Sequence, residues 1–174
     1  MIKIKAQARI QNYGGIGSAI AHEISHAFDA NGAKGDTIEN LANWWTAEDY
    51  KKFEEKTKAV VDQYNKVEYR GKKVNGNLTV SENIADISGL GAALEVTKQL
   101  PDANLEAFYK SWATVWRQKA RPQIEELKLT TDVHAPNKVR VNKVVANTDD
   151  FYSTFNIKEG DAMYMAPKDR ITIW

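Results

Sequence analysis

The chain has 174 residues, of which 43% are hydrophobic, and its 24 basic and 23 acidic residues leave a formal net charge of +1. This length and composition predict a single globular domain spanning residues 1–174. The balanced charge argues against a nucleic-acid partner or an anionic membrane surface, and no apolar run approaches the roughly 20 residues that span a bilayer. Because the chain has no cysteine, any metal site must use histidines and carboxylates.

Periodic apolar residues predict four helices in the first two thirds of the chain. The first covers about 12–31 and ends at Gly32; its apolar positions are Ile16, Ile20, Ile24, Ala27 and Phe28. The second begins at the capping pattern Thr46–Asp49 and runs to about Tyr64. The third covers about 80–98, and the fourth runs from Leu105 to near Pro122, where the proline disfavours continuation.

The remaining segments are less regular. Residues 69–76 have the composition of a loop or short hairpin, residues 124–129 add helix, and residues 132–142 are expected to form a loop with an extended piece. Minor strand content is expected at 74–80 and 171–174. The fold class is therefore mainly α with minor β.

One motif carries specific chemistry. His22, Glu23 and His26 form the pattern H-E-x-x-H inside the first predicted helix. Residues four apart lie on the same face of a helix, so both imidazoles can reach one ion while Glu23 lies beside them as a general base. The alternative is that these are ordinary helix histidines with a surface glutamate between them.

A catalytic zinc site needs a third protein ligand and one open position. The metzincin pattern would place a third histidine at position 32, which is Gly32, so a carboxylate on another helix is the better solution. Glu82 is the candidate, because Asp86 lies one turn further on and can accept a hydrogen bond from a ligand imidazole. Thr79–Glu82 also fits a capping box, and the local sequence does not decide between the two interpretations.

Several separated motifs together resemble the neprilysin family of zinc endopeptidases, and the resemblance runs from Asn12 to Trp174. The motifs are Asn12–Gly17, His22–Asp29, Asn40–Leu41, Trp44–Thr46, Glu82–Asp86, Trp116, Arg121–Pro122, Asp132–Pro136, Arg140–Val141 and Trp174. The resemblance implies a zincin-like helical catalytic domain of the gluzincin type. It also favours zinc binding over capping for Glu82.

The resemblance further implies a role for each site residue. His22, His26 and Glu82 would bind one zinc ion per chain, Glu23 would be the general base, and Asp86 would orient a zinc histidine. His134 would stabilise the transition state, with Asp132 setting its tautomer, and Arg140 would hold a substrate carbonyl. Asp29 would support the zinc helix, although an ordinary carboxylate at a helix end is an equal alternative.

The chain also departs from the family pattern. Family members are several times longer, and their large helical N-terminal domain and substrate-holding Asn-Ala-aromatic segment have no counterpart here, so we expect a C-terminal portion of that architecture. The lack of cysteines favours a bacterial type in the cytoplasm, with secretion or the cell surface as alternatives. Residues 1–11 lack the apolar core of a secretory signal.

The expected function is zinc-dependent hydrolysis of oligopeptides on the amino side of hydrophobic residues. One rival interpretation is a zinc-binding portion that is inactive without the substrate-capping domain. The other is a helical module that self-associates through exposed aromatic residues such as Trp44, Trp45 and Trp112.

Overall fold

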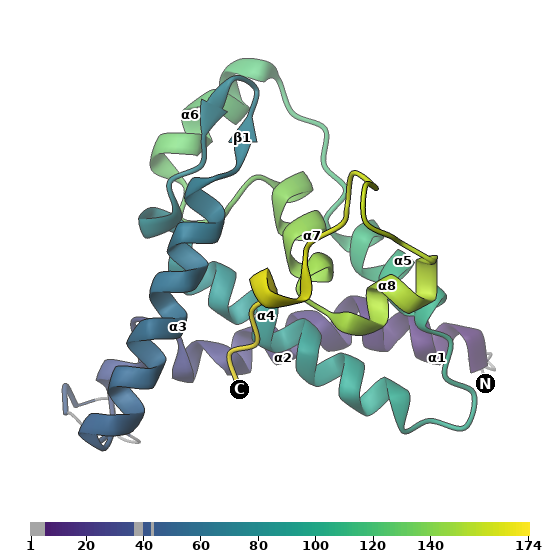
Figure 1. Cartoon of the computed structure of the whole chain (residues 1–174), viewed down its shortest axis with the longest axis horizontal. Coiled ribbons are helices and arrows are strands. Elements are labelled where there is room, and N and C mark those ends of the chain that lie inside the picture. Colours follow the sequence, from purple (N-terminus) through teal and green to yellow (C-terminus); the bar gives the residue numbers. More distant parts are fainter. Residues whose placement is uncertain (1–5, 37–39, 43) are drawn as a thin grey trace, which may run out of the picture.

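The computed structural model describes residues 6–36, 40–42 and 44–174, and it consists mainly of helices (Figure 1). The elements in chain order are α1 (Ala6–Asn12), the π-helical η1 (Tyr13–Gly17), α2 (Ser18–Ser25), the 3-10 turns η2 (His26–Phe28) and η3 (Gly32–Lys34), α3 (Ala47–Asn65), β1 (Glu68–Tyr69), β2 (Lys72–Lys73), α4 (Gly76–Lys98), α5 (Leu105–Val115), α6 (Pro122–Thr131), α7 (Asn137–Ala146), α8 (Asp149–Phe155) and the 3-10 turn η4 (Pro167–Asp169). The predicted mainly α class is confirmed.

Helix α4 lies at the centre of the molecule (Figure 1). It packs against α2, α3, α5 and α7, and it is buried at many positions around its circumference, which is the pattern of a core helix. The largest fully buried apolar side chains are Ile10 of α1 and a set from α4 and the helices around it: Val60, Tyr64, Ile84, Leu90, Phe108, Trp112 and Val144. Core packing on several sides of α4 therefore fixes the positions of the side chains on this helix.

Two helix starts are fixed by side-chain caps. Helix α3 begins as predicted, with Thr46 Oγ1 accepting a hydrogen bond from the Asp49 amide at 3.1 Å. Helix α4 begins at Gly76, where Asn75 Oδ1 accepts from the Leu78 amide at 3.1 Å, so the predicted start near Val80 was wrong by one turn. Glu82 consequently lies well inside the helix, and its interpretation as a capping residue is wrong.

Three predictions for irregular segments are corrected. The helix from Leu105 ends at Val115, and Pro122 instead begins α6, where its missing amide hydrogen costs nothing. Much of the segment expected as an extended loop forms α7, directly after Pro136. The expected strands at 74–80 and 171–174 do not form.

The segment expected as a loop or short hairpin is a hairpin. Strand β1 pairs antiparallel with β2, and the turn between them is made by Arg70 and Gly71. Their φ angles of 53° and 75° are the positive values that a two-residue hairpin turn requires. The strand content of the described chain is thus one short hairpin.

The first predicted helix is a helical segment that changes its pitch twice, through η1 and η2, and ends at Phe28. Its apolar stripe faces outward, with Ile16, Ile20 and Ile24 exposed to 60%, 54% and 66%. The face that packs on α4 carries the buried Ser18 and His22. Among the described helices, none has both the length and the apolar character that crossing a bilayer requires.

Candidate metal centre

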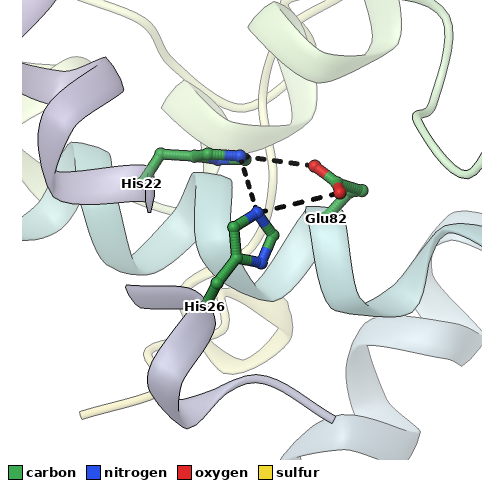
Figure 2. A group of neighbouring side chains, drawn as sticks. All are labelled: His22, His26 and Glu82. Atoms are coloured by element: carbon green, nitrogen blue, oxygen red, sulfur yellow. Dashed lines mark hydrogen bonds and ion pairs between the residues drawn. The ribbon is translucent and has the colours of Figure 1, made fainter. Parts of the chain in front are cut away.

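Two helical segments bring His22, His26 and Glu82 together, as Figure 2 shows. The two Nε2 atoms of the histidines lie 3.1 Å apart. Glu82 Oε2 is 3.3 Å from His22 Nε2, and Glu82 Oε1 is 3.7 Å from His26 Nε2. The three residues form a group with one donor atom each that could hold a metal ion.

A carboxylate holds the far nitrogen of each imidazole. Asp86 Oδ1 lies 2.8 Å from His22 Nδ1, and Asp29 Oδ2 lies 2.7 Å from His26 Nδ1. An ionised carboxylate can only accept, so each Nδ1 carries the hydrogen and each Nε2 presents its lone pair. Both lone pairs therefore point into the space between the rings, beside Glu82.

This arrangement fits a divalent cation. Two imidazole lone pairs and a carboxylate at these distances repel one another unless a positive charge lies among them. Two histidines and one glutamate are a known ligand set of catalytic zinc, which keeps a fourth position open. The side chain of His26 is 30% exposed, so the group is accessible from solvent.

The buried groups around the centre have shifted pKa values. Burial lowers the pKa of His22, but its interactions with Asp86 and Glu82 outweigh this and raise it to about 9. Burial raises the pKa of Glu82 and Asp86, but their contacts with positively charged partners prevail and lower both. Both carboxylates thus favour a positive charge beside them at His22, and a bound cation would supply that charge in place of a proton on His22 Nε2.

Asp86 is fully buried and is shared between two partners. It faces His22 on one side, and on the other its two oxygens accept hydrogen bonds from Arg140 Nε and Nη2, both at 2.7 Å. Arg140 is only 4% exposed, and its guanidinium lies 3.7 Å from the ring centre of Trp116. The Nη1 atom of Arg140 makes no hydrogen bond within the described chain.

His134, in the loop between α6 and α7, lies beside the metal-site residue Glu82. Its Nε2 lies 3.0 Å from Glu82 Oε2, and its Nδ1 lies 2.8 Å from Asp132 Oδ1. Burial raises the pKa of Asp132, but hydrogen bonds from the His134 amide and ring outweigh this and lower it to about 2. Asp132 therefore stays ionised, holds the hydrogen on Nδ1 of His134 and fixes the direction of Nε2.

Glu23 lies between the two histidines on α2, with an exposed side chain that makes no hydrogen bond or ion pair within the described chain. A cavity of about 370 Å³ opens next to the centre, and Asp132, His134 and Trp116 contribute to its lining. The contacts above join the other residues predicted for the site, whereas Glu23 is near them only as the chain neighbour of His22, and Arg140 is held by Asp86.

Sequence reasoning missed two features. Asp29 was expected only as a support of the zinc helix, yet its Oδ1 also accepts from the amides of Asn31 and Gly32 at 2.7 and 2.8 Å, which anchors the chain after the helix. The pairing of Asp86 with Arg140 was not foreseen. The only signal for it was a carboxylate and an arginine in two separate motifs, and 54 residues separate them.

Comparison with known proteins agrees with this geometry. The fold is that of a helical domain of the zincin type. Residues 5–171 match the model of peptidase family M13, and the chain belongs to this family. The resemblance to the neprilysin family and the zincin-like fold class are thereby confirmed.

Individual relatives agree with the assignment to this family. A neutral endopeptidase of Lactococcus lactis is 51% identical over 168 residues, which cover 97% of this chain and 27% of that protein. The crystal structure of PepO from Lactobacillus rhamnosis superposes with a TM-score of 0.91 at 46% identity, over 95% of this chain and 26% of that one. The zinc metalloprotease ZMP1 of Mycobacterium tuberculosis gives a TM-score of 0.89 at 38% identity, over 95% and 28%. The chain thus spans about a quarter of the length of these relatives.

Proposed function

We propose that this chain is the zinc-binding catalytic portion of an M13 endopeptidase that hydrolyses oligopeptides. The observation that carries the proposal is the convergence of His22, His26 and Glu82, with each imidazole oriented by its own carboxylate. One zinc ion per chain would be held by these three residues. When bound, zinc polarises the scissile carbonyl and makes a water molecule more acidic.

Residues around the metal centre have the roles of general base and of oxyanion stabilisation. Glu23, exposed beside the two histidines, takes a proton on its carboxylate from the attacking water and returns it to the leaving amine. His134 acts in its imidazolium form, in which Nδ1 donates to Asp132 and Nε2 donates to the oxyanion that develops on the carbonyl. Such a donor contributes about 3 to 4 kcal/mol to the transition state.

Asp86 and Arg140 complete the proposed site. Asp86 fixes the ring of His22, and the Arg140 guanidinium neutralises Asp86 and offers Nη1 to a substrate carbonyl. The cavity beside His134 gives room for a substrate side chain, and cleavage on the amino side of hydrophobic residues is the specificity we expect. A single domain over residues 1–174 and a bacterial cytoplasmic location remain part of this proposal.

Replacing the proposed base tests the function. Glu23→Gln should bind zinc as the wild type does and lose cleavage of a short fluorogenic peptide, because glutamine cannot accept the proton. Glu54→Gln, which changes an exposed glutamate on α3, is the matched control and should cleave at the wild-type rate. A Glu23→Gln variant with near-wild-type turnover would contradict the role.

The same assay separates the rival interpretations. A wild-type chain that binds zinc but cleaves nothing, with or without a chelator, would identify a zinc-binding portion without activity of its own. Of the tryptophans on which the self-association alternative relies, Trp112 is fully buried, whereas Trp44 is exposed to 48%. Sedimentation that does not depend on concentration would remove that alternative.

A further inference from the structure

Helix α4 presents Glu82, Asp86 and Gly89 at positions i, i+4 and i+7, which lie on one face of a helix. The first two face the imidazole of His22, as the distances above establish. Figure 2 shows Glu82 on α4 and the two histidines on the facing helical segment of α2 and η2. Of all pairs of elements in the described chain, α2 and α4 have the most extensive contact. The third position, Gly89, lies at that contact.

Gly89 touches the backbone of the zinc helix. A Cβ placed there would lie 2.5 Å from the His22 amide nitrogen, 2.7 Å from His22 Cα and 3.0 Å from the Ala21 carbonyl carbon. All three are backbone atoms, so no change of rotamer can relieve the contact. Any side chain at position 89 must therefore move one helix away from the other.

The residue that would be pushed is itself a candidate metal ligand. His22 must keep Nδ1 on Asp86 and Nε2 toward His26 and Glu82, and these partners are divided between the two helices. Ordinary contact for an added Cβ begins at 3.4 Å, well beyond 2.5 Å. The difference exceeds the displacement of about 0.5 Å that a metal or catalytic site tolerates.

We propose that Gly89 is a positioning residue for the metal centre: its missing side chain lets α2 approach α4 closely enough for His22 to share one ion with Glu82 while it keeps Asp86. This rests on the proposed function. Gly89 touches neither the ion nor the substrate, and it acts only through the backbone of His22.

Alanine variants at three glycines of α4 test the proposal. Gly91 lies on the same helix with nothing within 4 Å of an added Cβ, so Gly91→Ala controls for the gain in helix propensity. Gly76→Ala controls for a clash elsewhere, because its Cβ would lie 2.3 Å from the Val61 carbonyl oxygen of α3. Each folded variant is titrated with cobalt(II) and zinc, and both affinity and the visible spectrum of the cobalt complex are measured.

Gly89→Ala should bind both ions about 10-fold or more weakly than the wild type and show an altered cobalt spectrum, a loss of the size seen when support of a ligand is removed. Gly91→Ala should match the wild type, and Gly76→Ala should have a lower Tm but wild-type metal affinity. The proposal is overturned by wild-type affinity and spectrum in Gly89→Ala, by an equal loss in Gly76→Ala, or by a Gly89→Ala chain that stays unfolded with cobalt. A wild-type chain that binds neither ion would instead refute the proposed function.

Discussion

The ion pair of Asp86 with Arg140 gives the sharpest test of how the core supports the metal centre. Asparagine at position 86 keeps the size of the side chain but removes its charge, and it places an amide group against either the arginine or His22. Arg140, at 4% exposure, would then be a buried charge without a counter-charge. Breaking a buried ion pair in this way costs about 3–5 kcal/mol of unfolding free energy.

The same substitution should weaken the metal site. Without a carboxylate on Nδ1, the His22 ring loses the partner that fixes its orientation, and losses of this kind lower metal affinity about 10- to 100-fold. Denaturant unfolding of the metal-free protein measures the loss of unfolding free energy. Competition against a chromophoric zinc chelator measures the loss of zinc affinity.

The control for Asp86→Asn is an ion pair on the surface. Glu106 and Lys110 pair on α5 with side chains that are 56% and 66% exposed, so Glu106→Gln should cost less than about 1 kcal/mol and leave zinc affinity unchanged. If Asp86→Asn behaved like this control in both measurements, the assignment of Asp86 as the support of His22 would be refuted.

Three further changes have defined outcomes. Asp29→Ala removes the acceptor for His26 Nδ1 and for two backbone amides, so it should lower both zinc affinity and Tm in calorimetry, and an unchanged zinc affinity would refute its support of His26. Asn75→Ala removes only the cap of α4 and should cost about 1 kcal/mol in denaturant unfolding with little change in zinc affinity; no loss of stability would contradict the cap. The folded-state pKa of Asp132 lies below its ordinary 3.8, so its contribution to stability is present above pH 3.8 and disappears as pH falls through about 2. In acid titrations of metal-free protein, the stability gap between wild type and Asp132→Asn should therefore close over that range, and a constant gap would contradict the shift.

The ligands could be predicted from the sequence because their signal is local. His22 and His26 are four residues apart on one helix, and Glu82 and Asp86 repeat that spacing on another. The start of α4 was misplaced because Thr79 to Glu82 satisfies a capping pattern that lies inside the helix, and the Asn75 cap is formed one turn earlier. A pattern of residue types cannot tell which of two adequate caps the chain uses.

Features that depend on contacts between distant segments could not be predicted. The pairing of Asp86 with Arg140 and the stacking of that arginine on Trp116 join three helical regions with no common sequence signal. The isoleucine stripe of α2 predicted a helix, but not that the face with Ser18 and His22 would turn inward. In this helix the inward direction is set by packing on α4, where the His22 imidazole meets Glu82 and Asp86, while the Ser18 hydroxyl donates to the Tyr13 carbonyl oxygen of η1.

Zinc content of the purified protein after dialysis tests the central claim most directly. Wild type and Glu95→Ala, which changes an exposed glutamate on the same helix as Glu82, should each retain one zinc ion per chain by atomic absorption, whereas Glu82→Ala should lose most of it. A ratio of one in Glu82→Ala would show that Glu82 is not a ligand and would contradict the account of the site.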